Sequence, residues 1–229
     1  MSRTRTSLAD YLTGRFTPLL VALATISLVA NFFPHGELRL LLIDAALSVA
    51  FLFAARIVGR RQRLATLVFA LPALIGIWSL RLPTTLIHEV LVFLSTFAFL
   101  SYLTVLMLIA VLRDEAVTSD TIVGAVCVYL LLGVTWGNAY ALVVLLDPGA
   151  IAVSSEMATN SHWMPLKPIT PLLQHYSFNN LTTLGMDDVT AMSGAARTLA
   201  TMEAITGQLY LAILIARLVG MHSTRSRRS

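Results

Sequence analysis

Long apolar runs separated by short polar turns account for most of the chain. Each run has about the 20 residues that an α-helix needs to cross the hydrocarbon core of a bilayer. The runs are residues 16–33, 38–58, 64–80, 86–112, 121–146 and 197–219. This pattern predicts an all-α membrane protein with six transmembrane helices.

Composition agrees with this pattern. Of the 229 residues, 57% are hydrophobic and only 12% are charged, and the mean hydropathy is +0.79. Such values are far from those of ordinary soluble domains. A net charge of +4 would suggest a nucleic-acid partner for a soluble protein. Here the arginines stand beside apolar runs, so we expect the lipid bilayer as partner and no nucleic acid. The single cysteine, Cys127, is expected to be a buried, inert thiol.

Basic residues are distributed unevenly over the turns between the runs. Cytoplasmic segments of membrane proteins carry an excess of arginine and lysine. With both termini cytoplasmic, most of the 16 basic residues fall on that side: Arg3, Arg5, Arg15, Arg56, Arg60, Arg61, Arg63, Arg113, Arg217, Arg225, Arg227 and Arg228. The others are Arg39, Arg81, Lys167 and Arg197. We therefore expect an integral protein of the plasma (inner) membrane with both termini in the cytoplasm.

A different pattern fills the segment between the last two runs. Thr170 and Pro171 suit the cap and the first position of a helix. Residues 172–182 continue this helix for about three turns, roughly 16 Å, or half a bilayer. A polar turn follows at 182–188, and irregular backbone at membrane depth is tolerated only where protein buries it or where it lines a water-filled path. The layout predicts a re-entrant pore helix and filter loop between the fifth and sixth transmembrane helices.

Several short motifs in this segment resemble the pore signature of the potassium-channel superfamily, bacterial two-transmembrane-helix type. They are Tyr176-Ser177-Phe178, Leu181-Thr182-Thr183-Leu184-Gly185 and Asp188, and residues 199–220 resemble the inner helix of bacterial members. The resemblance covers residues 113–220, close to half of the chain. It implies passive conduction of a monovalent cation, K⁺ or Na⁺, through a cyclic homotetramer, with no cofactor and no metal other than the permeant ion.

The resemblance also implies which residues form the site. The filter is implied at Thr182, Thr183, Leu184, Gly185, Met186, Asp187 and Asp188, where carbonyl and hydroxyl oxygens would replace the water shell of the ion. In that family the filter reads Thr-Val-Gly-Tyr-Gly-Asp, so Met186 stands in the place of Tyr and Asp187 in the place of the second Gly. Gly207 stands where the family has its gating hinge. Bending at Gly207 and close helix packing at a small residue are both open interpretations.

The two departures from the family pattern predict relaxed selectivity. Three outcomes are open: a wider upper filter, an acidic ring of Asp187 and Asp188 that concentrates cations, or a collapsed filter. The leading hypothesis is a tetrameric transmembrane cation channel of potassium-channel type. The alternative is a non-conducting membrane scaffold or sensor that keeps the channel fold. Adjacent carboxylates can also serve acid–base catalysis, but no partner histidine or metal-ligand cluster accompanies them, so we expect no enzyme.

The chain divides into two regions on this interpretation. Residues 1–112 form a four-helix N-terminal transmembrane region, and residues 113–229 form a pore domain of outer helix, pore helix, filter and inner helix. Voltage sensing needs several charges inside the membrane field, normally an arginine ladder. Residues 86–112 contain no arginine or lysine. We therefore expect weak or absent voltage dependence.

Side chains around the expected pore have expected roles of their own. Gly133 and Gly137 form a small-xxx-small pair that is expected to serve packing. Glu203 is expected to bond to the pore-helix backbone or to the base of the filter. Thr206 and Gln208 are expected to face the cavity.

Overall fold

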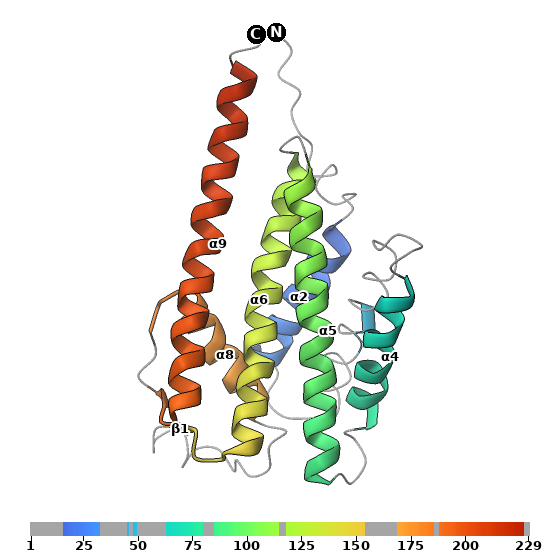
Figure 1. Ribbon diagram of the computed structural model, residues 1–229, viewed down its shortest axis with the longest axis vertical. Coiled ribbons are helices and arrows are strands. Elements are labelled where there is room, and N and C mark those ends of the chain that lie inside the picture. The colour runs from blue at the N-terminus through green and yellow to red at the C-terminus, as the bar shows by residue number, and fades with distance from the viewer. Residues whose placement is uncertain are drawn as a thin grey trace.

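The computed structural model describes residues 16–32, 45, 48–49, 63–79, 85–114, 118–153, 169–185 and 188–226. Within these residues the chain is mostly helical, with six helices and one two-stranded sheet. In chain order the elements are α2 (Thr17–Phe32), α4 (Arg63–Ser79), α5 (Leu86–Arg113), α6 (Ser119–Leu146), β1 (Ile151–Val153), α8 (Ile169–Leu181), β2 (Val189–Ala191) and α9 (Gly194–Ser226) (Figure 1). Most of the second predicted run, 38–58, lies outside the described residues, as do Met186 and Asp187.

Three of these helices are long and apolar enough to cross a bilayer. They are Leu86–Arg113, Ser119–Leu146 and Gly194–Arg217. All three coincide with runs that the sequence pattern assigned as transmembrane helices, and they indicate a membrane protein. Within the described residues, α2 has 16 residues and α4 has 17, and they follow the first and third predicted runs.

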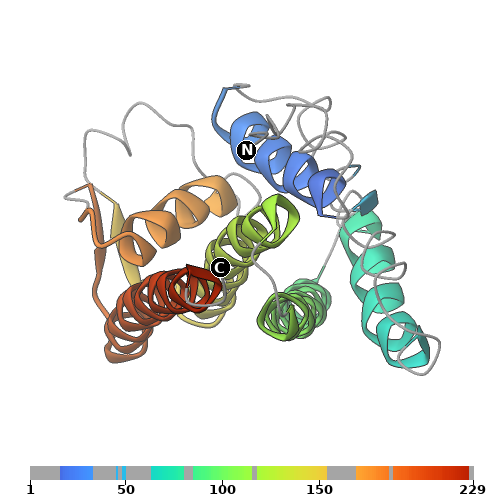
Figure 2. The same ribbon diagram turned by 90° about the horizontal axis from the view of Figure 1, so that it is seen from above.

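α6 is the central helix of the arrangement. α2 and α5 pack against it on one side, and α8 and α9 pack against it on the other. α4 packs mainly against α5. Seen from above, α4 and α8 therefore lie at opposite ends of the assembly, with α5 and α6 between them (Figure 2).

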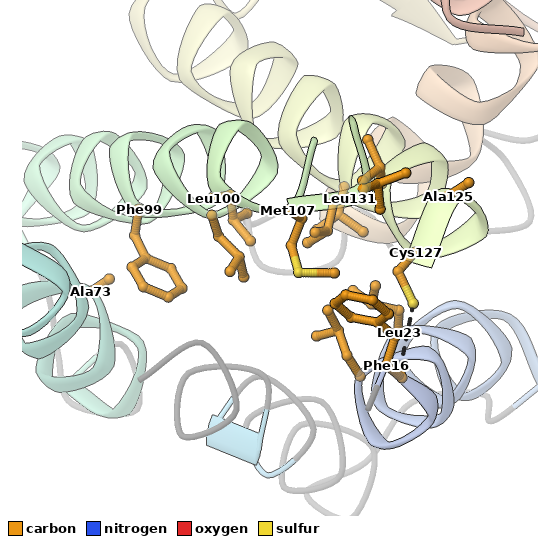
Figure 3. Packing of buried hydrophobic residues seen from close by; sticks show 14 residues of the cluster. Phe16, Leu23, Ala73, Phe99, Leu100, Met107, Ala125, Cys127 and Leu131 are labelled. Carbon is orange, nitrogen blue, oxygen red and sulfur yellow. Dashed lines mark hydrogen bonds between the residues drawn. The ribbon is translucent and has the colours of Figure 1, made fainter. Parts of the chain in front are cut away.

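Two apolar clusters hold α6 in this position. The larger one joins α2, α4, α5 and α6, and Figure 3 shows its side chains gathered between these helices. Gly124 of α6 allows the close approach, since a Cβ at this position would lie 2.9 Å from atoms of both Phe16 and Val111. Cys127 is buried in this cluster with its Sγ 3.7 Å from the carbonyl oxygen of Phe16, so the expected buried thiol is confirmed.

The start of α6 differs from the apolar pattern for a local reason. The run of apolar residues begins at 121, but the helix begins at Ser119. Thr118 precedes it as the cap, its side chain accepts the backbone N–H of Thr121, and the Thr121 side chain in turn accepts the N–H of Thr118. This reciprocal capping box fixes the first turn through polar contacts, which hydrophobic periodicity does not report.

Candidate functional site between α6 and α9

α8 and the turn after it form a hairpin that enters and leaves at the same end of α6. The first turns of α8 pack beside the C-terminal part of α6, where Leu173 and Tyr176 cluster with Tyr140. Its last residue, Leu181, lies near the middle of two long helices, because its carbonyl accepts a hydrogen bond from Tyr129 and contacts Gly207. α8 therefore runs about halfway along α6, a descent of roughly 20 Å for its 13 residues.

The chain then returns to the end of α6 from which α8 started. β2 pairs antiparallel with β1, which follows α6 after a short turn, in the register Ile151↔Ala191 and Val153↔Val189. At this end of α6, the ladder joins the segment that follows α6 to the segment that returns from the turn. The amino-acid pattern does not predict this ladder, because three-residue strands are too short to show an alternating pattern.

Two glycines of α6 receive α8. A Cβ at Gly133 would lie 2.3 Å from the ring of Phe178, and one at Gly137 would lie 2.8 Å from Oε1 of Gln174. The carbonyl of Gly133 accepts hydrogen bonds from Gln174 Nε2 at 2.9 Å and Ser177 Oγ at 2.7 Å. The expected packing role of this glycine pair is thus confirmed, with α8 as the element that packs there.

A third glycine lets α9 approach the end of α8. A Cβ at Gly207 would lie 2.1 Å from the carbonyl oxygen of Leu181, closer than any side chain permits. α9 is one continuous helix through this position. Close packing, one of the two interpretations left open by the sequence, is therefore present at Gly207. The hinge role stays a prediction.

The start of α8 differs from the position that the sequence predicts. The helix begins at Ile169, one residue before the Thr170 that was expected to cap it. Pro171 consequently occupies the third position of the helix and not the first. It is still inside the first turn, where a missing N–H removes no intrahelical bond, so the helix tolerates it.

The turn after α8 contains the residues with left-handed backbone in the described chain. Thr183 has a φ of 55° and Gly185 a φ of 83°. The N–H of Leu184 donates to the carbonyl of Asn179 at 2.9 Å, and that of Thr183 to Asn180 at 3.0 Å. This pair of bonds is a Schellman C-cap, in which the left-handed residue is usually glycine. Threonine at this position is strained by about 1 kcal/mol.

The strained turn is open to its surroundings. Thr182, Thr183, Leu184, Gly185 and Asp188 are all exposed. Gln208 of α9 faces the turn, since its Nε2 donates to Oγ1 of Thr183 at 3.1 Å. The Thr206 hydroxyl donates to the Met202 carbonyl of its own helix, and its expected place beside the cavity stays a prediction.

A buried polar cluster lies behind this turn, where α6, α8 and α9 meet. Glu203 of α9 is fully buried. Its Oε2 accepts a hydrogen bond from the Tyr140 hydroxyl at 2.7 Å, and its Oε1 lies 2.5 Å from Ser177 Oγ. Glu203 therefore contacts α8 as expected, but through a side chain and not through the helix backbone or the filter base. Asn180 Nδ2 completes the cluster with a bond to the Tyr140 hydroxyl.

A second contact holds α9 further toward its C-terminus, at Arg217. The guanidinium of Arg217 donates from Nη1 to the Val111 carbonyl and from Nη2 to the Asp114 carbonyl, both at 2.5 Å. These carbonyls belong to the C-terminal end of α5, where backbone acceptors lack helical partners and a positive charge is favourable. In the sequence, Arg217 indicates only the orientation of the helix in the membrane, because a side chain that binds backbone carbonyls leaves no motif.

The described part of this region offers backbone carbonyl and hydroxyl oxygens, which are atoms that could coordinate a cation. In the described ranges, no group of three or more His, Cys, Asp or Glu side chains could hold a metal ion. Carbonyl and hydroxyl oxygens are instead concentrated in the turn 182–185, next to α9. Comparisons of the chain with protein-family models, curated proteins and solved structures found no match.

Proposed function

We propose that the chain is one subunit of a tetrameric transmembrane cation channel of potassium-channel type with relaxed selectivity. Each subunit contributes six transmembrane helices, with α8 as a re-entrant pore helix between α6 and α9. The residues Thr182 to Asp188 form the filter, and the permeant ion is K⁺ or Na⁺. Conduction is passive, down the electrochemical gradient.

One observation carries this proposal. α8 runs about halfway along α6, ends in an exposed turn with left-handed backbone at Thr183 and Gly185, and returns to the end of α6 where it began. In a lipid bilayer, exposed irregular backbone at this depth needs a water-filled path beside it. Backbone strain of this kind is typical of functional sites, where surrounding structure holds it in place.

The need for several copies supports the tetramer. One turn supplies oxygen atoms from one side only, whereas a dehydrated cation needs a ring of them. Leu184, in the middle of the turn, is 79% exposed in the single chain. A cyclic assembly around the turn would provide both the ring of oxygens and the cover for this apolar side chain.

The filter assignment is tested by restoring the family pattern. Purified protein in liposomes should pass K⁺ and Na⁺ with little discrimination, measured as tracer flux under equal gradients. The double variant Met186→Tyr with Asp187→Gly should raise the preference for K⁺ at least several-fold. Asp147→Gly removes an exposed carboxylate at the end of α6 and should leave the ratio unchanged. Permeability ratios that do not move in the double variant would refute the filter assignment.

The strained threonine gives a second test. Thr183→Gly relieves the left-handed strain and should raise the free energy of unfolding by about 1 kcal/mol, while the loss of one hydroxyl per subunit lowers flux. Thr198→Gly, on the exposed side of α9, should lower stability instead, because glycine is unfavourable inside a helix. An intact tetramer without any flux would favour the non-conducting scaffold or sensor.

A further inference from the structure

The buried carboxyl of Glu203 lies in a chain of three short oxygen–oxygen contacts. Ser177 Oγ lies 2.7 Å from the Gly133 carbonyl oxygen and 2.5 Å from Glu203 Oε1. Glu203 Oε2 lies 2.7 Å from the Tyr140 hydroxyl. Two oxygen atoms approach to such distances only with a hydrogen atom between them. The three contacts therefore need three hydrogen atoms.

Without a proton on the Glu203 carboxyl, the cluster has only two hydrogen atoms for these three contacts. A carbonyl has no hydrogen to donate, and the serine and tyrosine hydroxyls have one each. The tyrosine hydrogen is committed to Glu203, because the other neighbour of the Tyr140 hydroxyl is the amide nitrogen of Asn180, itself a donor at 3.3 Å. The serine hydrogen can serve Gly133 or Glu203, but not both. The third hydrogen must belong to Glu203.

The surroundings agree with an uncharged carboxyl. Side chains that face it are Ser177 and Asn180 from α8 and Tyr140 from α6, with the Tyr176 ring packed edge-on against Tyr140 at 5.0 Å. Among the described residues no basic side chain pairs with it. An ionised carboxylate in such a place would be costly without a positive partner.

We propose that Glu203 is a neutral carboxylic acid that donates its proton to Ser177 and thereby positions α8 against α6 and α9. In this arrangement Glu203 Oε1–H donates to Ser177 Oγ, Ser177 donates to the Gly133 carbonyl, and Tyr140 donates to Glu203 Oε2. The chain of bonds crosses all three helices. It acts one helical turn before the Schellman cap, so it fixes where the turn 182–185 lies. Glu203 is a positioning residue. The proton on its carboxyl follows from the contacts alone, whereas its importance for ion flux rests on the proposed function.

Infrared spectroscopy of the protein in liposomes tests the proton directly. We expect the C=O stretching band of a protonated carboxyl at neutral pH, absent from Glu203→Gln and shifted in Ser177→Ala. Glu89→Gln removes a half-buried carboxyl at the start of α5 and should leave the band in place. A spectrum that contains only carboxylate bands, or a carboxyl band that survives Glu203→Gln, would overturn the proposal.

Rescue by the conservative variant gives a second readout. The amide of Glu203→Gln can donate to Ser177 and accept from Tyr140, as the neutral acid does, so its thermal unfolding temperature should match that of the unchanged protein. Glu203→Ala leaves Ser177 and Tyr140 without their partner and should lower this temperature markedly. Equal losses in the two variants would contradict a neutral acid. Should Glu203→Ala not fold, the comparison of Glu203→Gln with the unchanged protein decides alone.

Flux measured in the same liposomes separates the two proposals. The carboxyl band together with an absence of flux supports the neutral acid and refutes the channel. Flux without the band supports the channel and refutes the neutral acid. Where both are present, Glu203→Gln should keep the flux within about a factor of two, and Ser177→Ala should reduce it.

Discussion

α6 and α9 are both long, apolar helices, yet the rest of the chain buries α6 far more than α9. Of the most apolar stretch of each, 61% is buried for α6 and 11% for α9. α6 is enclosed by α2, α5, α8 and α9, whereas α9 packs against the other described helices mainly along one line of residues. Hydropathy alone does not separate these two cases.

The contact line of α9 follows helical spacing. It consists of Glu203, Gly207, Tyr210, Leu214 and Arg217, three or four residues apart, each of which bonds to or packs against α5, α6 or α8. Large apolar side chains on the remaining faces are exposed: Met202, Ile205, Leu209, Ile213, Ile215 and Val219. A single chain thus encloses α6 but leaves most of α9 exposed, where lipid or, in the proposed tetramer, further copies of the chain could cover it.

The largest effect is expected from the interior of α6. Leu131 is fully buried in the cluster around this helix. Leu131→Ala should lower the free energy of unfolding by about 3–4 kcal/mol, because it removes buried methyl groups and leaves a cavity. Denaturant titration of the purified protein in detergent measures this loss. A loss below about 1 kcal/mol would mean that α6 is not the enclosed helix described above.

The next effect concerns the closest approach of α9. Gly207→Ala places a methyl group against the Leu181 carbonyl and should cost about 3 kcal/mol, since backbone cannot move aside as a side-chain end can. Gly194→Ala is the matched control, with no atom within 4 Å of the added Cβ. The two variants are compared by thermal unfolding. Equal stability of both would show that α9 is not held at Gly207.

A smaller effect is expected at the far end of the contact line. Arg217→Ala removes two charge-assisted hydrogen bonds to α5 and should cost about 2 kcal/mol. Arg217→Lys should recover only part of this, because an ammonium lacks the planar fork that reaches both carbonyls. Arg197→Ala, which removes an exposed arginine with one bond to Ala191, should cost no more than about 1 kcal/mol. The same unfolding assay ranks the three variants.

The smallest effect is expected on the bare side of α9, where two neighbouring residues make the comparison sharpest. Ile213 is 59% exposed, whereas Leu214 packs against the main cluster. In single chains dispersed in detergent, Leu214→Ala should cost about 2 kcal/mol and Ile213→Ala less than about 0.5 kcal/mol. The assembled protein in liposomes provides the second measurement. If Ile213→Ala lowers the stability of the assembled protein only, this face of α9 contacts another copy of the chain.

The sequence predicted the long helices well because their length and hydropathy alone define them. α5, α6 and α9 begin within about three residues of the predicted runs, and each difference has a polar cause such as the Thr118 cap. The existence of a half-length helix before a Thr/Gly turn was also predicted. Its start was misplaced because Thr170 offered a plausible cap one residue inside the helix.

Contacts between distant residues could not be read from the sequence. The β1–β2 ladder joins segments 38 residues apart through three residues each, and the Arg217 clamp uses backbone acceptors that every residue carries. Glu203 could be recognised in the sequence as a candidate functional residue, since it is a carboxylate within an apolar run. Its partners Ser177 and Tyr140 follow only from the packing of three helices.

Two of the contacts that hold α9 have a mechanical consequence. Gly207 rests on the end of α8 and Arg217 grips the end of α5, about 15 Å further along the helix axis. The helix continues to Ser226, so its last turns project like a lever beyond the second support. We therefore expect a sideways displacement of these last turns to strain the Arg217 hydrogen bonds first and, once they are lost, to rotate α9 about its contact with Leu181 at Gly207.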